Sequence, residues 1–544
     1  MKFNAVSLSL LGFSTLTAAT LAGGPTYRGE TNDQLEKRQT GPRYPTYTFD
    51  QLIDHFPESP RYAPHTDATF KQRYVYDSTY YKPGGPVYLY IGGETSAESR
   101  FSNLVTGLIQ ILMQETNGLG IILENRYYGQ SYPFNTSTTD QLAYLTTEQT
   151  IADNEYFARN VKLPGINETL NAPDRPWILY GGSLAGAQTA FSLKTYPQTL
   201  WAGIAASAPV EVIVGYWQWY SPIQKYAPQD CVASINNIID KIDYLVSTNN
   251  SAAIQQLKDI FGLGALEDIR DFAMTIAFPL GGPMNYPTNT WQELNWSPSG
   301  SRDFWDFCNN VTNLDAPANI TAVDNQLAQY TNGSSWTNLG NYADYVKRVV
   351  VPLCETGDIN SVLNGCFGTQ NQTYYADVSN GGGRSYLYST CTEQGAYQVA
   401  PPSGPSLVSR VLQADYTQQW CTWAFPPGEY NSIPSSPDTT QYTKYGGFNF
   451  SADRLAFIDG DQDVWLDLCY HSNNASARYS SDLHPEHLIS GGGHHWDSYG
   501  IKNVSAEPQF IQNAHYWEIR TVRKWLQMKE ESDKQKRLVA GRDL

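Results

Sequence analysis

Continuous apolar runs bounded by glycine or polar residues recur through the first half of the chain. Their length and composition are typical of strands buried on both faces of a sheet. Stretches with helical spacing separate them, including residues 103–114 and the alanine-rich stretch that follows residue 183. The predicted strands lie at residues 45–56, 69–76, 86–91, 120–124, 176–180, 203–207 and 454–458. This alternation predicts an α/β fold with a parallel sheet, helices on both of its faces, and chemistry at the carboxyl ends of the strands.

The pattern changes after about residue 216. Amphipathic helices are predicted at residues 234–246 and 252–261, and the alternation returns only at the strand near residue 454. A long helix at residues 513–530 then precedes a charged end. We therefore expect an α/β domain interrupted by a large, mainly helical insertion that contains disulfides. The expected parts are a first α/β segment at 45–215, the insertion at 216–425, a second α/β segment at 426–530 and a flexible tail at 531–544.

The amino terminus resembles a secretory signal. A short charged start, an apolar run and small residues predict a signal peptide at 1–22, and the dibasic pair Lys37-Arg38 predicts a pro-segment at 23–38. A membrane anchor is the alternative, but no later run reaches the roughly 20 apolar residues that a span requires. About eleven N-x-S/T sequons predict N-linked glycans on an extracellular protein.

The net charge and the cysteines narrow the possible partners and the compartment in which the protein works. The net charge of −17 argues against nucleic acid or an anionic membrane as a partner, and is compatible with work in mildly acidic solution. An oxidising compartment would let six of the seven cysteines pair and leave one free. The cysteines are Cys231, Cys308, Cys354, Cys366, Cys391, Cys421 and Cys469.

A glycine-serine turn at residues 176–187 is the first candidate for chemistry. The apolar run breaks on Gly181, Gly182 and Ser183 and then becomes alanine-rich. Strand, sharp turn and helix in this order are typical of a nucleophile elbow, although Gly186 lies one position later than in the usual G-x-S-x-G pattern. The backbone N–H groups of Leu184 and of Gly93, in the Gly92-Gly93-Glu94 loop, are the expected oxyanion donors.

The second half of the chain supplies a base and an acid for this serine. Asp459, Asp461, Asp463 and Asp467 follow the strand at 454–458, and His494-His495 lie on a glycine-rich loop. The order serine, aspartate, histidine is that of α/β-hydrolases. A calcium loop lacks the required glycine and spacing, and adjacent histidines in an extended loop point apart, which disfavours a zinc pair. We therefore expect neither a metal nor a cofactor.

Several motifs together resemble those of one family of serine peptidases. It includes the Pro-Xaa carboxypeptidase, the quiescent-cell dipeptidyl peptidase and the fungal acid prolyl endopeptidases. The resemblance spans about residues 49–525 and rests on the motifs at 49–56, 69–74, 92–94, 124–129, 144–149, 181–183, 391–393 and 493–495. It implies an α/β-hydrolase fold with a helical cap, the triad Ser183, Asp463 and His494, and cleavage after proline.

Three positions depart from the family pattern. Leu184 replaces a tyrosine, Asp459 an asparagine and Val464 a proline. Trp465 is a candidate wall of an aromatic proline pocket, while Glu94 and Glu393 either bind a substrate amine or brace loops. The prediction is a secreted serine peptidase acting on peptide or protein substrates, with an esterase or lipase of the same fold, or an inactive peptide-binding glycoprotein, as alternatives. The sequence leaves open whether it is an endopeptidase or a carboxypeptidase.

Overall fold

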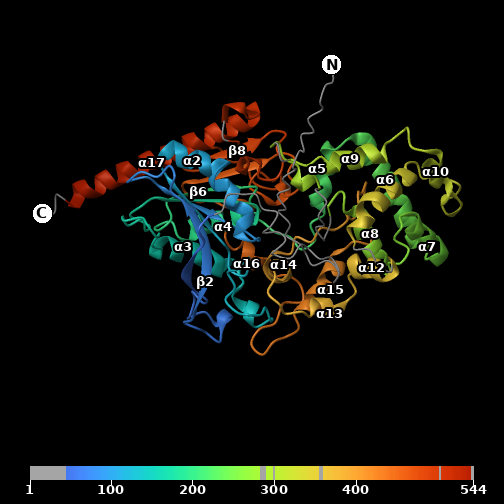
Figure 1. Cartoon of the computed structure of the whole chain (residues 1–544), viewed down its shortest axis with the longest axis horizontal. Coiled ribbons are helices and arrows are strands. Elements are labelled where there is room, and N and C mark those ends of the chain that lie inside the picture. The colour runs from blue at the N-terminus through green and yellow to red at the C-terminus, as the bar shows by residue number, and fades with distance from the viewer. Residues whose placement is uncertain (1–43, 282–289, 298–299, 355–358, 502–503, 541–544) are drawn as a thin grey trace, which may run out of the picture.

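The computed structural model describes residues 44–281, 290–297, 300–354, 359–501 and 504–540 (Figure 1). The expected signal peptide and pro-segment lie outside these residues.

One eight-stranded sheet forms the centre of the fold, in the order β1-β2-β4-β3-β5-β6-β7-β8. The first two strands pair antiparallel with each other, β2 pairs antiparallel with β4, and all other neighbours are parallel. The bounds are β1 Tyr47–Leu52, β2 Thr69–Asp77, β3 Val87–Ile91, β4 Leu119–Leu123, β5 Trp177–Gly182, β6 Ala202–Ala206, β7 Leu455–Gly460 and β8 Glu486–Ile489. The predicted α/β class is confirmed, and the seven predicted strands form close to their expected positions.

Helices cover both faces of this sheet, which explains why the central strands are apolar throughout. In β3, Tyr88 and Tyr90 pack on the side of α2 (Leu108–Thr116) and α17 (Gln509–Ala540). The alternate residues Val87 and Leu89 pack on the other side, with residues of α3 (Thr147–Asn160) and α4 (Leu184–Thr195). All five residues of β3 are buried, as expected for a strand between two layers of helices.

The α-helix predicted at residues 103–114 begins later than expected. Residues Ala97–Leu104 form the 3-10 helix η2, and α2 starts only after Gly107. Gly107 has φ +99°, which lies outside the helical region, so the chain turns there before the α-helix begins.

Most of the chain between β6 and β7 is helical, and residues 216–425 of it are the predicted insertion. No strand forms in its described residues, and Figure 1 shows its helices gathered to one side of the sheet. They are α5 Ser221–Tyr226, α6 Gln229–Ser247, α7 Ser251–Ile260, α8 Ile269–Ala277, α9 Asp303–Val311, α10 Ala318–Thr321, α11 Leu339–Tyr345, α12 Ile359–Cys366, α13 Gln372–Tyr375, α14 Gly382–Ser389 and α15 Ala414–Ala424. The short helix α16, Thr440–Thr443, follows the predicted insertion and packs on α4 through Tyr442 and Phe191. One hydrophobic cluster joins residues of the insertion, such as Phe272 and Trp336, to Ile53 and Val464. The insertion therefore shares its core with the sheet domain.

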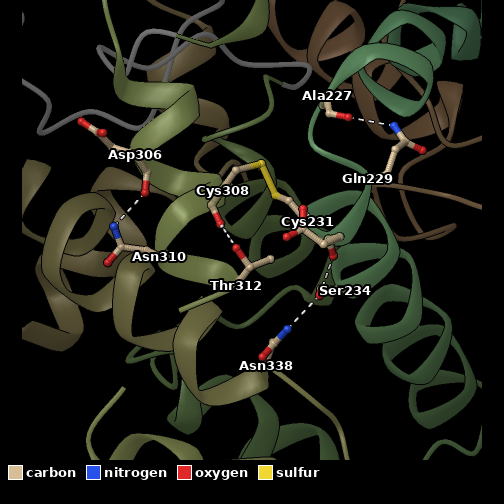
Figure 2. Close-up of a disulfide and its surroundings, with 10 residues drawn as sticks. Ala227, Gln229, Cys231, Ser234, Asp306, Cys308, Asn310, Thr312 and Asn338 are labelled. Carbon is tan, nitrogen blue, oxygen red and sulfur yellow. Dashed lines mark hydrogen bonds between the residues drawn. A yellow bond between two sulfur atoms is a disulfide. The ribbon is translucent and has the colours of Figure 1, made fainter. Parts of the chain in front are cut away.

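Three disulfides cross-link the insertion. Figure 2 shows Cys231–Cys308, which joins α6 to α9. The other two bridges are Cys354–Cys366 and Cys391–Cys421. Cys469 stays free and buried, so the expectation of six paired cysteines and one free cysteine is confirmed.

The carboxyl-terminal helix α17 is longer than the sequence predicts. It begins at Gln509 and continues to Ala540, so the expected flexible tail at 531–544 is helical as far as that residue. No glycine or proline interrupts it, and an i,i+4 pair between Lys529 and Asp533 at 2.8 Å supports the turn where the tail was expected to begin. Within the described parts of the chain, none of the helices combines the length and apolar character needed to cross a membrane.

Candidate active site

Strand β5 passes directly into helix α4 through Ser183. This serine has φ +60° and ψ −130°, a conformation that residues other than glycine rarely adopt, and its N–H donates to Ala206 O at 2.9 Å. A Cβ on Gly181 would lie 2.1 Å from Ala185 O, and one on Gly186 would lie 2.6 Å from Ala206 O. Both positions therefore require glycine, and the result is a sharp strand-to-helix turn at the carboxyl end of the sheet.

The loops after β7 and β8 bring a carboxylate to a histidine. His494 Nδ1 lies 3.0 Å from both carboxylate oxygens of Asp463, and both side chains are buried. Burial alone lowers the pKa of His494, but the Asp463 carboxylate outweighs it and the pKa is raised above its usual 6.5. The other ring nitrogen, Nε2, is buried and has no hydrogen-bond partner. It is therefore free to accept a proton from a group that approaches it.

The neighbouring His495 attaches this loop to the serine turn. Its backbone N–H donates to Ser207 Oγ at 2.8 Å, and its ring lies so close to Gly182 that a Cβ there would be 3.0 Å from the imidazole. Its Nδ1 lies 2.8 Å from Ser498 Oγ, and burial lowers the pKa of His495 well below 6.5. Of the two adjacent histidines, only His494 is paired with a carboxylate, while His495 is a neutral residue that braces the loop.

The loop after β3 approaches the first turn of α4. Gly93 has φ +75°, and a Cβ at this position would lie 3.6 Å from the Ala185 side chain. The carbonyl of Gly92 accepts a long hydrogen bond of 3.4 Å from Arg100 Nε, which restrains the peptide that carries the Gly93 N–H. The two predicted oxyanion donors, the N–H groups of Gly93 and Leu184, therefore lie on adjacent segments.

The two candidate glutamates have different surroundings. Glu393 is 3% exposed, pairs with Arg61, and accepts a hydrogen bond of 2.9 Å from Thr147 N at the start of α3. Both of its oxygens are thus engaged, which favours the bracing role. Glu94 is half-buried and forms no hydrogen bond or ion pair with another described side chain, and its charge contributes to the raised pKa of His494. Glu94 therefore remains the candidate for a substrate amine.

Trp465, the candidate pocket wall, lies close to Asp463. Its backbone N–H donates to Asp463 Oδ1 at 2.9 Å, and its half-buried indole stacks on Tyr216 with ring centres 5.5 Å apart. The Tyr216 hydroxyl donates to Val464 O at 2.7 Å, so the residue that replaces the family's proline is held through its carbonyl. Leu184, which replaces a tyrosine, is 9% exposed at the start of α4 and packs in an apolar cluster.

The four aspartates at the end of β7 and in the loop after it have different surroundings. Asp459 lies 2.6 Å from His471 Nδ1, and Asp461 accepts from Gly491 N at 2.8 Å. Asp463 faces His494, and burial raises the pKa of Asp467. Their carboxylates do not converge, and among the described residues no group of three or more His, Cys, Asp or Glu side chains is placed to hold a metal ion.

Sequence reasoning missed a group of buried acids behind the histidine loop. The Tyr180 hydroxyl donates to Asp497 Oδ2 at 2.8 Å, while neither carboxylate oxygen of the fully buried Glu518 has a hydrogen-bond partner. Nearby, His515 Nδ1 lies 2.8 Å from Glu507. Burial raises the pKa of Asp497 to about 6, and burial together with the Asp497 carboxylate raises the pKa of Glu518 well above 4.5. No motif marks these residues, because they come from β5, the loop after β8 and α17.

This group makes the stability depend on pH. Unfolded Glu518 loses its proton near pH 4.5 but folded Glu518 keeps it to higher pH, so the folded chain binds more protons in that window and stability falls as pH rises through it. We expect Glu518→Gln to leave the free energy of unfolding at pH 4 nearly unchanged and to raise it by about 1–2 kcal/mol at pH 7.5. Urea unfolding at both pH values measures this, with exposed Glu531→Gln as the control. An equal effect of Glu518→Gln at both pH values would contradict the prediction.

Comparison with known proteins gives consistent matches over most of the chain. A family model described as serine carboxypeptidase S28 matches residues 51–514. A probable extracellular serine carboxypeptidase from Arthroderma benhamiae is 36% identical over 509 residues, which cover 89% of this chain and 68% of that protein. The serine protease vicPb from Bipolaris victoriae is 29% identical over 498 residues, covering 88% of each chain. Among solved structures, an acetylester hydrolase from Corynebacterium glutamicum aligns over 87% of this chain and 94% of its own, with a TM-score of 0.32 and 8% identity.

Proposed function

The chain belongs to the serine carboxypeptidase S28 family, and from this premise we propose that it is a secreted peptidase that cleaves peptides after proline through an acyl-enzyme. The extracellular description of the Arthroderma benhamiae relative supports secretion, as do the three disulfides. Sequon asparagines at 135, 167, 249 and 474 are exposed, so glycans can be attached there.

The observation that carries the mechanism is the unpartnered Nε2 of His494, on a loop held against the Ser183 turn. In the proposed reaction, His494 Nε2 removes the proton from Ser183 as its oxygen attacks the scissile carbonyl. Asp463 keeps the Nδ1 proton in place and stabilises the imidazolium that forms. The same proton then passes to the leaving amine, and water later hydrolyses the acyl-enzyme.

Two backbone groups would hold the negative charge that develops on the carbonyl oxygen. The N–H of Leu184 lies at the amino end of α4, where the helix dipole favours negative charge. The N–H of Gly93 approaches from the loop after β3. Donors fixed in this way stabilise the tetrahedral intermediate without reorganising during the reaction.

The proline preference rests on the aromatic surroundings of the acid. Trp465 is half-buried beside Asp463 and stacks on the fully buried Tyr216, so Trp465 is the aromatic side chain against which a proline ring would pack. Glu94, whose charge contributes to the raised pKa of His494, is the proposed partner for a free amine on the substrate. Neither contact requires a metal or a cofactor.

Two features of the structure have opposite effects in acid: one lowers the rate and the other favours the folded state. The raised pKa of His494 means that the free base is increasingly protonated in acid, so kcat/KM should fall below that pKa. The buried Asp497 and Glu518 side chains, however, favour the folded state at low pH. Through these groups, acid favours the folded state while it limits the rate.

A labelling and product experiment tests this function. We expect a fluorophosphonate probe to label Ser183, and an amino-blocked peptide ending in Pro-Phe to release phenylalanine. The same peptide with Ala in place of Pro, its carboxyl-terminal amide and an alkyl ester of the blocked proline are the comparisons, with products read by mass spectrometry. Absence of labelling on folded protein would indicate an inactive peptide-binding glycoprotein, and turnover of the ester alone would indicate an esterase.

A further inference from the structure

A short segment of the insertion, residues 291–296, contacts both loops of the proposed acid–base pair. On the histidine loop the bonds are reciprocal: Trp296 Nε1 donates to Trp496 O at 2.9 Å, and Trp496 Nε1 donates to Leu294 O at 2.6 Å. Trp496 lies two residues after His494, and both indoles are half-buried. The histidine loop is therefore attached to the insertion directly beside its catalytic candidate.

The same segment is bonded to the aspartate loop. Trp291 Nε1 donates to Gln462 O at 2.9 Å, and Trp465 Nε1 donates to Gln292 Oε1 at 3.1 Å. Gln462 and Trp465 flank Asp463 in the chain. Four indole hydrogen bonds thus connect one segment of the insertion to both loops, and we call this arrangement the tryptophan clasp.

The two loops also have restraints outside the insertion, such as the bond from His495 N to Ser207 Oγ, but the contacts between the loops themselves are few. They meet through Gln462 N, which donates to Gly492 O at 2.9 Å, and through the Asp461–Gly491 bond. Glycines make up much of the histidine loop, and a loop rich in glycine samples many conformations unless other contacts hold it. Acid–base catalysis requires reacting atoms to be held to within a fraction of an ångström, and a displacement of about 1 Å can cost roughly 100-fold in rate.

We propose that the tryptophan clasp positions the Asp463–His494 pair, so that the insertion takes part in catalysis as well as covering the site. This inference rests on the proposed function. Trp296 and Trp496 are positioning residues because they act through the histidine loop and not on the substrate. The charge of Glu293, in the middle of the segment, contributes to the raised pKa of His494, which agrees with the closeness of the clasp to the imidazole.

The test removes single indole donors and keeps an aromatic ring. We expect Trp296→Phe and Trp496→Phe each to lower kcat about 5- to 20-fold with KM changed less than 2-fold. Loosening the contact with Asp463 should also move the acid limb of kcat/KM to lower pH, since burial alone lowers the histidine pKa. The double variant should lose less than the product of the two single losses, because both bonds restrain one loop.

A matched control separates positioning from general damage to the insertion. Trp423 is also half-buried in the insertion, on α15, and packs against Tyr375, so Trp423→Phe should leave kcat and the pH profile unchanged. Gln292→Ala is the milder second variant, because it removes only the acceptor for Trp465 and leaves every tryptophan in place. We expect it to lower kcat about 3-fold.

The results that would overturn the clasp inference differ from the results that would overturn the proposed function. If wild-type Ser183 is labelled and peptides are cleaved, but the clasp variants retain wild-type kcat and pH profile, the clasp inference fails while the peptidase assignment stands. Equal losses in the clasp variants and in Trp423→Phe would also overturn it. If either tryptophan variant does not fold, Gln292→Ala decides: a kcat and pH profile equal to wild type would overturn the inference, and a reduced kcat with unchanged KM would support it.

Discussion

Replacing Ser183 with alanine is expected to reduce kcat for a proline-containing peptide by about 10⁵- to 10⁶-fold. The variant lacks the oxygen that is proposed to form the acyl-enzyme, so only weak catalysis by bound water and the oxyanion donors would remain. Alanine at this turn would meet the same steric cost of φ +60° as serine does, and the Ser183 side chain caps no helix N–H group. We therefore expect the variant to fold and to keep its affinity for substrate.

The measurement compares single-turnover rates and thermal unfolding of wild type and Ser183→Ala. Ser247→Ala, a change of the same size at an exposed position in α6, is the control and should leave the rate unchanged. Loss of fluorophosphonate labelling should accompany the loss of activity. Retention of more than about one hundredth of the wild-type rate would show that another nucleophile performs the reaction.

Replacing Asp463 with asparagine is expected to cost about 10⁴-fold in kcat. The carboxylate faces His494 Nδ1 at 3.0 Å, and an amide N–H in its place would favour the tautomer with the proton on Nε2. That nitrogen could then no longer accept the proton of Ser183. The remaining activity should have its acid limb at lower pH, because the group that raises the pKa of His494 is gone while burial, which lowers it, remains.

The neighbouring aspartates provide the control for this prediction. Asp461→Asn keeps an oxygen that can accept from Gly491 N, and Asp461 has no hydrogen bond to His494. We expect it to change kcat less than 10-fold, measured over pH 4–9 with the same peptide. A larger loss for Asp461→Asn than for Asp463→Asn would assign the acid to a different carboxylate.

The α/β architecture was predictable from local patterns because a strand between two layers of helices needs apolar residues on both faces. The five residues of β3 meet this requirement, so the strand can be recognised as an apolar run in the sequence. The turn at Ser183 was also predictable, since the close approach of Ala185 O to Gly181 permits only glycine there. The length of α17 was not predictable. Helix ends depend on weak local preferences, and the charged residues after 530 gave no sign that the helix continues to Ala540.

The sequence by itself determined seven of the eight strands, with short β8 missed, the helical character of much of the chain before β7, and candidates whose chemistry depends on residue type, such as Ser183, Asp463 and His494. The family resemblance pointed to His494, but only the tertiary structure shows that its ring, and not that of His495, faces a carboxylate, because that depends on how two loops from different strands meet. It also placed Glu393 on Arg61, Glu518 among buried acids, and Trp296 on the histidine loop 200 residues away. These contacts join residues distant in the chain through burial and hydrogen-bond geometry, so no local periodicity or spacing in the sequence records them.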